Sequence, residues 1–246
     1  MNCTIIPLLI ALLLAPLAAL RAADAPPARQ TIGSLPAARV LFLGNSITLH
    51  GPKPDIGWTG NWGMAASAEE KDYVHLLTAD IAKAAGAQPR TMVRNIADFE
   101  RGYDGFDIAA GVKAELDFGA DIVVVAIGEN VPEPATEDAR AKFAAAFARL
   151  LAALKQHGQP AIFVRSSFWP DAVKDGIMRK ACADAGAAFV DIAALGRDAA
   201  NAASSERKIG HAGVAGHPGD RGMRAIADAI FAALQTRAAT IPSKAR

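Results

Sequence analysis

The sequence has little cysteine, no excess of charge of either sign, and one long apolar run. Two cysteines occur among 246 residues, too few for a zinc site or a disulfide framework. The 26 basic and 25 acidic residues are scattered and nearly cancel, so no basic patch of the kind that binds nucleic acid is present. Hydrophobic residues make up 52% of the chain, which excludes a disordered protein. We expect a folded domain without a nucleic-acid partner.

Motifs for metals and nucleotide cofactors are also lacking. The histidines at positions 50, 75, 157 and 211 show no metal-ligand spacing with one another. The glycine turn near residue 44 does not continue as the Gly-x-Gly-x-x-Gly fingerprint of dinucleotide-binding proteins. We therefore expect neither a metal nor a cofactor.

The long apolar run lies at the N-terminus, in residues 4–20, and carries no charge. A membrane-spanning helix needs about 20 apolar residues, whereas this run is shorter and contains Pro7 and Pro16. Small residues follow it, which is typical of a secretory signal peptide. We predict a signal peptide over 1–22, secretion or export to the periplasm, and no stable membrane insertion after cleavage. An uncleaved membrane anchor is the alternative.

Short apolar segments alternate with amphipathic segments through the rest of the chain. The pattern predicts an α/β protein, a three-layer α/β/α sandwich with a central, mainly parallel five-stranded sheet. We assign one domain to 38–236, a Pro/Ala-rich tail to 23–37 and a second tail to 237–246. The predicted strands are 39–43, 91–96, 121–127, 161–165 and 188–192, and the predicted helices are 67–86, 137–156, 171–186 and a last helix from 218.

Polar residues follow several of these strands, at the sheet edge where α/β proteins bind ligands. Ser46 follows the first strand, Asn130 follows the third, and His217 precedes the last helix. A nucleophile, a base and an amide donor are the set that acyl transfer needs. Each residue also has an ordinary explanation, since Ser46 suits a turn, Asn130 a cap and His217 a helix N-terminus.

The sequence resembles the SGNH hydrolases, also called GDSL esterases and lipases. The matching pieces are Gly44-Asn45-Ser46-Ile47-Thr48, Gly128-Glu129-Asn130 and His217-Pro218. The resemblance implies a flavodoxin-like α/β/α fold, Ser46 as nucleophile and His217 as general base. It also implies that the Asn130 side chain and the backbone N–H of Ser46 bind the oxyanion.

Three positions depart from the family pattern. The usual Asp after the first Gly is Asn45, and the second block, at Asn95, lacks its following glycine. The family's catalytic Asp lies three residues before the His, where this chain has Val214. A backbone carbonyl such as that of Val214 could orient the imidazole instead and leave a Ser–His dyad. The alternative acids are Glu129, Glu100 and Asp220.

Tryptophans flank the predicted site in the sequence. Trp58 and Trp62 lie in a Gly-rich segment after the serine turn, and Trp169 follows the fourth strand. Such rings could stack on a sugar at the rim of the site or form a hydrophobic lid. We expect an exported serine esterase that hydrolyses short-chain esters, acetyl in the first place, on carbohydrates. A non-catalytic glycan-binding module and an O-acyltransferase are the alternatives, and the oligomeric state is open.

Overall fold

The computed structural model describes residues 30–240. The predicted signal peptide, 1–22, lies outside these residues, as do the first part of the N-terminal tail and the last six residues. Within the described part of the chain, no helix has the length and apolar character needed to cross a membrane.

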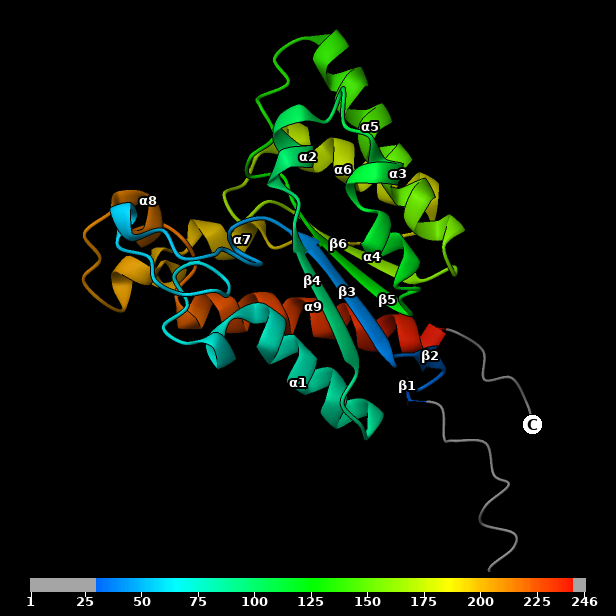
Figure 1. The fold of residues 1–246 in the computed structure, drawn as a ribbon, viewed down its shortest axis with the longest axis horizontal. Helices are drawn as coiled ribbons and strands as arrows, with labels where there is room; N and C mark the ends of the chain where they lie inside the picture. Colours follow the sequence, from blue (N-terminus) through cyan, green and yellow to red (C-terminus); the bar gives the residue numbers. More distant parts are fainter. Residues whose placement is uncertain (1–29, 241–246) are drawn as a thin grey trace, which may run out of the picture.

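A parallel five-stranded sheet forms the centre of the molecule, in the order β4-β3-β5-β6-β7 (Figure 1). Each predicted strand is present, with its ends shifted by no more than two residues. The fold class predicted from the sequence is confirmed. The strands are β3 (Arg39–Gly44), β4 (Arg90–Asn95), β5 (Ile122–Ala126), β6 (Ala161–Arg165) and β7 (Ala188–Val190).

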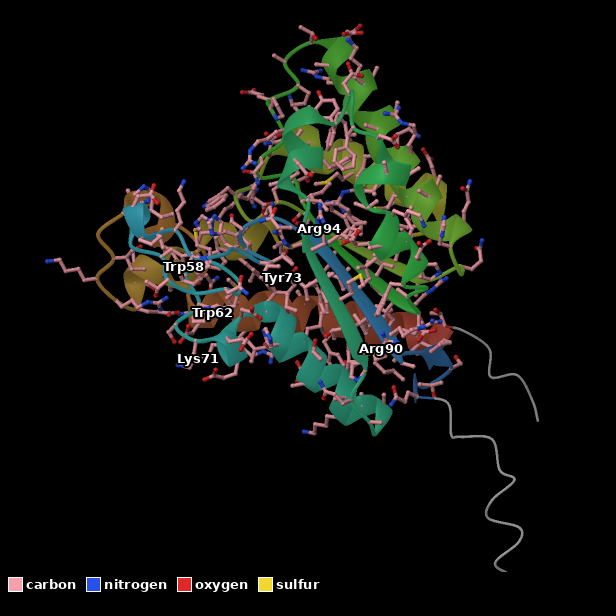
Figure 2. The ribbon with its side chains drawn as sticks, in the orientation of Figure 1. Trp58, Trp62, Lys71, Tyr73, Arg90 and Arg94 are labelled. Carbon is pink, nitrogen blue, oxygen red and sulfur yellow. The ribbon has the colours of Figure 1, made fainter. Side chains whose placement is uncertain are left out.

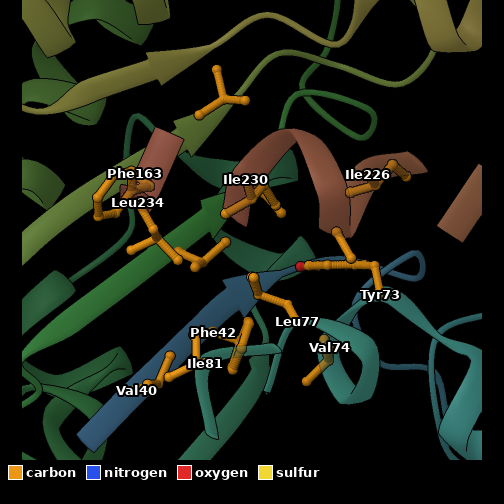
Figure 3. Close-up of a cluster of buried hydrophobic side chains, with 14 of the residues drawn as sticks. Val40, Phe42, Tyr73, Val74, Leu77, Ile81, Phe163, Ile226, Ile230 and Leu234 are labelled. Carbon is orange, nitrogen blue, oxygen red and sulfur yellow. The ribbon is translucent and has the colours of Figure 1, made fainter. Parts of the chain in front are cut away.

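Helices cover both faces of the sheet. Val40 and Phe42 of β3 point to the face packed against α1 (Tyr73–Ala85) and α9 (Asp220–Thr240), and Figure 3 shows this cluster. Leu41 and Leu43 point to the opposite face, which packs against the second helical layer. The period of two along β3 therefore separates two cores, as expected for a strand buried on both sides. The second layer contains α2 (Ala97–Gly102), α3 (Ile108–Gly111), α4 (Lys113–Asp117), α5 (Glu137–Gln156) and α6 (Ala172–Ala185).

Loops with short helices lie beyond the carboxyl ends of the strands, near the start of α9 (Figure 1). A third hydrophobic cluster, which includes Trp58, Met64, Ala65 and Val214, holds two of these loops together. Their short helices are η1 (Pro54–Ile56), η2 (Glu69–Lys71), α7 (Ala193–Arg197), η3 (Ala199–Asn201), η4 (Ala203–Ser205) and α8 (Ala212–Ala215).

The first helix begins later than the capping box at Ser67 predicts. Its N-cap is Asp72, whose carboxylate accepts the backbone N–H of His75 at 2.8 Å. Ser67 instead donates its hydroxyl to Asp220 at 2.6 Å, at the start of α9. The last helix likewise begins at Asp220, two residues after the predicted Pro218. A tertiary contact thus takes the place of the local cap.

The structure also differs from the predicted tails. Residues 30–37 contain a small hairpin, β1 (Thr31–Ile32) and β2 (Leu35–Pro36). Its Ile32 and Leu35 are buried in the core beside α9. That helix continues to Thr240, with Ala238 buried near the hairpin. Both segments therefore belong to the domain rather than to tails, because their apolar side chains close one end of the core.

Candidate active site

Ser46 and His217 meet at the carboxyl edge of the sheet. The Ser46 hydroxyl lies 2.9 Å from Nε2 of His217, although the residues are 171 positions apart in the chain. Ser46 sits in a tight turn after β3, where the Asn45 side chain accepts the backbone N–H of Ile47 at 3.2 Å. Gly44 is required in this turn, because a Cβ atom there would lie 1.9 Å from the Thr48 hydroxyl. The turn holds the hydroxyl out toward the histidine.

The second ring nitrogen of His217 fixes its tautomer. Nδ1 lies 2.7 Å from the backbone carbonyl oxygen of Gly213. A carbonyl only accepts hydrogen bonds, so Nδ1 carries the proton and the neutral ring presents Nε2 as an acceptor. Nε2 is therefore ready to take the proton of Ser46. The carbonyl belongs to Gly213, not to Val214, whose side chain is buried in the third cluster.

His217 is largely buried, and burial lowers its pKa below the usual value of 6.5. The bond to Gly213 and the charge of Glu129 act in the opposite direction but do not outweigh burial. The ring of Trp169 packs edge-on against the imidazole, with centroids 5.1 Å apart. These surroundings keep the ring neutral and in one orientation.

None of the three acids named from the sequence is hydrogen-bonded to His217. Asp220 accepts bonds from Ser67 and from Lys71, at 3.0 Å from the lysine. These contacts lower its pKa in spite of partial burial. Glu129 and Glu100 bond to other groups below the site. The orienting group on Nδ1 is thus a backbone carbonyl, as in the dyad arrangement.

Glu100, at the inner side of α2, organises the segment that follows β5. Its carboxylate accepts the backbone N–H of Gly128 at 2.6 Å and the side-chain amide of Asn130 at 2.8 Å. Arg101 donates to the amide oxygen of Asn130 at 3.1 Å. The two contacts orient the amide, and its second N–H remains for a bound oxyanion. Gly128 adopts φ 126°, and a Cβ there would lie 2.2 Å from the Ser167 hydroxyl.

Glu129 forms a buried ion pair with Arg165, the last residue of β6, at 2.6 Å. Its carboxylate also accepts the Asn45 amide at 2.6 Å and the backbone N–H of Phe168 at 2.7 Å. Burial would raise the pKa of Glu129, but the charge and hydrogen bond of Arg165 hold it lower. The pKa of Glu100 is raised by burial and by the neighbouring Glu129 charge. The buried carboxylate of Glu129 thus connects the turn at Ser46, through Asn45, to the end of β6 and the loop that follows it.

Sequence reasoning missed Arg101 and Arg165. Arg165 ends the apolar segment AIFVR, and a charge at the end of a buried strand is a signal that could have been noticed. Arg101 had no signal of its own, because its importance comes from its contact with Asn130, 29 residues away.

A cavity of about 320 Å³ opens above the serine and histidine. A groove of about 810 Å³ lies between α5 and α6 and contains none of these residues. The cavity beside Ser46 is lined by Ser46, His50, Ile56, Met64, Asn95, Ala97, Arg101, Asn130, His211, Gly213, Val214 and His217.

The three tryptophans have different surroundings. Trp58 is buried, and its N–H donates to the carbonyl of His50. Trp62 is half-buried, packs edge-on against Trp58, and donates to the carbonyl of Ala66 (Figure 2). Both rings therefore help to shape the loop near the site, and the ring of Trp58 offers no exposed face to a ligand. Trp169 is 41% exposed and packs against His217, which lines the cavity.

Within the described part of the chain, neither a metal-binding cluster nor a reactive cysteine is present. Among residues 30–240, no group of three or more metal-binding side chains lies close enough to hold an ion. Cys182 lies on the buried side of α6, and burial raises the pKa of its thiol to about 12. A thiol with that pKa is unreactive at neutral pH.

Comparisons with known proteins agree with the fold. No protein-family model matches the chain, and no curated protein matches its sequence. A candidate GDSL-like lipase from Bacteroides uniformis matches the structure with a TM-score of 0.55 at 16% identity, over 82% of this chain and 97% of that one. A similar protein from Bacteroides ovatus has a TM-score of 0.53 at 16% identity, over 81% and 99%. A family two carbohydrate esterase from Cellvibrio japonicus has a TM-score of 0.52 at 18% identity, over 87% of this chain and 63% of that one.

These likenesses agree with the motifs at Ser46, Asn130 and His217, which lie together at one edge of a five-stranded parallel sheet. The chain has the fold of the SGNH, or GDSL-type, hydrolases.

Proposed function

We propose that the protein is a serine esterase that removes short acyl groups, chiefly acetyl, from carbohydrates or related small esters. The contact that carries this proposal is the 2.9 Å distance between the Ser46 hydroxyl and His217 Nε2. The bond from Nδ1 to Gly213 makes Nε2 the basic nitrogen. A hydroxyl beside an oriented neutral imidazole is an activated nucleophile.

The reaction has two halves. His217 takes the proton of Ser46 as the oxygen attacks the ester carbonyl, and the oxyanion binds the free N–H of Asn130 and the backbone N–H of Ser46. The imidazolium then gives its proton to the leaving alcohol, which leaves an acyl-serine. Water, deprotonated by His217, attacks the acyl group, and the proton returns to Ser46 as the acid departs. The Gly213 carbonyl stabilises the imidazolium in both halves, in place of a carboxylate.

The substrate class rests on the size and surroundings of the cavity. A cavity of about 320 Å³ suits a small acyl group, and the exposed ring of Trp169 offers an apolar face at its rim. One protein of similar fold is a family two carbohydrate esterase. Export through a cleaved leader, predicted for residues 1–22, is part of this proposal, since polymeric carbohydrates occur outside the cell.

The proposal is tested by labelling and hydrolysis. A fluorophosphonate probe should label the wild-type protein at Ser46, and 4-nitrophenyl acetate should be hydrolysed. Ser46→Ala should abolish both, and His217→Gln should reduce both by about 10³-fold or more. Ser205→Ala is the matched control, because Ser205 lies away from the cavity and bonds to backbone carbonyls. Absence of labelling in the wild-type protein would exclude the esterase.

Two alternative functions would use the same residues. An acyltransferase would pass the acyl group to a sugar hydroxyl, and product analysis with and without a sugar acceptor separates it from a hydrolase. The exposed Trp169 beside His217 would also serve a glycan-binding module. In that case the wild-type protein binds oligosaccharides and reacts with neither the probe nor the ester.

A further inference from the structure

We propose that Arg101 forms a carboxylate-binding subsite beside the oxyanion amide, so that the preferred substrate is an acidic ester such as an acetylated sugar acid. This inference rests on the proposed esterase function and narrows its substrate class. The carboxylate belongs to the alcohol part of the ester, the part that extends from the small acyl site toward the cavity mouth.

Arg101 is an unpaired cation at the site. It occupies the last turn of α2, is exposed, and lines the cavity with Ser46 and His217. Among the residues that the structure describes, no carboxylate lies within ion-pair distance of its guanidinium, and its hydrogen bond goes to the Asn130 amide oxygen. The adjacent Glu100 is turned inward to Gly128 and Asn130.

The cavity lining contains a cation, Arg101, and no carboxylate. Its titratable residues are Arg101 and the histidines at positions 50, 211 and 217, and no aspartate or glutamate is among its lining residues. A guanidinium has five N–H donors in a planar fork. One bond to Asn130 leaves enough donors for a two-point contact with a carboxylate, the geometry that arginine favours.

The position of Arg101 also suits the hydrolysis of an acidic ester. A substrate carboxylate near the Asn130 amide would repel the developing oxyanion unless a cation neutralised it. Arg101 contacts the same amide from the side opposite Glu100, so it can offset that repulsion where it arises. Neutral esters gain nothing from this contact, and the arginine therefore separates acidic from neutral substrates.

The test compares two acetylated monosaccharides that differ at one group. Methyl glucuronoside and methyl glucoside are each acetylated at the same hydroxyl. The first has a carboxylate where the second has a hydroxymethyl group. We expect the wild-type kcat/KM for the acidic ester to exceed that for the neutral ester by about 10- to 100-fold, the factor that one charge-assisted contact supplies. Added salt should lower this ratio.

The variants distinguish charge recognition from positioning of the amide. Arg101→Gln should lower kcat on both esters, because its bond to Asn130 is lost, but it should raise KM only for the acidic ester and so bring the ratio close to one. Arg101→Lys should retain part of the ratio. Arg149→Gln, which removes the same charge from the exposed side of α5, should keep the wild-type ratio. A wild-type ratio near one, or an equal loss on both esters in Arg101→Gln, overturns the proposal; the equal loss would mean that Arg101 acts only through Asn130.

Binding without turnover keeps the inference separate from the esterase reaction. In Ser46→Ala, methyl glucuronoside should bind more tightly than methyl glucoside by calorimetry, and adding Arg101→Gln should remove the difference. A protein that hydrolyses neither ester but shows this difference refutes the esterase and retains the anion subsite. A protein that hydrolyses both esters equally and binds both glycosides equally supports the esterase and refutes the anion subsite.

Discussion

In the proposed reaction, His217 acts as a base without a carboxylate partner. A carboxylate on Nδ1 would raise its pKa, whereas the Gly213 carbonyl orients the ring at 2.7 Å without adding a full negative charge. Burial then dominates and lowers the pKa below the usual 6.5. The residue is therefore a weaker base than a triad histidine, but it stays neutral over a wider range of pH.

This difference predicts the pH dependence of activity. The base must be neutral, so kcat/KM should fall as the pH decreases through the pKa of His217 in the free enzyme. Because that pKa is lowered, the midpoint should lie below 6.5. A pH profile of acetyl ester hydrolysis measures it, with circular dichroism at each pH to show that the protein stays folded. A midpoint above 6.5 would indicate that a carboxylate reaches Nδ1.

At the scale of elements, α2 carries two residues that bond to the side-chain amide of Asn130, the proposed oxyanion donor. Glu100 and Arg101 are adjacent, yet one points into the core and the other into the cavity. The helix is six residues long, and its first turn follows directly after β4. A short helix at a strand end can thus fix a catalytic amide from both sides.

Glu100→Gln should lower kcat by about 10²-fold with little change in KM, the size of effect seen when an oxyanion donor is lost. The glutamine would place an amide N–H against the donors of Gly128 or Asn130, which now share the carboxylate, and so release the Asn130 side chain. Steady-state kinetics separate the two constants. A pure KM effect would contradict this role.

Glu129→Gln, in the segment after β5, is the matched comparison for Glu100→Gln. It removes the charge partner of the fully buried Arg165, and breaking a buried pair costs about 3–5 kcal/mol. We expect a large fall in the denaturation midpoint for Glu129→Gln and a smaller one for Glu100→Gln, whose charge is repelled by Glu129. Equal losses of stability would show that the two carboxylates have the same role.

The sequence predicts the elements well and their side-chain partners poorly. Buried parallel strands appear in a sequence as short apolar runs, so β6 was predicted at its observed ends and β3 to within one residue. Ser46 and His217 could be paired because strand ends converge at one edge. Contacts such as Glu129 with Arg165 join residues 36 positions apart, and no local pattern encodes them. For the same reason the sequence left open whether Trp58 lies at the rim of the site or in a hydrophobic lid, and the ring is buried.

At the scale of the whole molecule, one end of the sheet holds the proposed active site and the other end closes the core. The carboxyl end holds Ser46 and His217, while the hairpin β1-β2 covers the opposite end of the core, beside the last turns of α9 (Figure 1). The hydroxyl of Ser34 bonds to the carbonyl of Ala238 at 3.2 Å. Stability at one end and chemistry at the other should therefore be separable by truncation.

A chain that begins at residue 38 should be less stable than one that begins at residue 30. The shorter chain loses Ile32 and Leu35 from the core, and burying two such side chains contributes about 3–6 kcal/mol to the free energy of unfolding. Urea denaturation of both chains measures the difference, and Leu35→Ala in the longer chain should reproduce part of it. Below the unfolding transition both chains should have the same kcat, because the removed residues contact α1 and α9 and none of them lines the cavity at Ser46. Equal stability of the two chains would mean that the hairpin contributes nothing to the core, and a lower kcat at equal stability would mean that the two ends of the sheet are coupled.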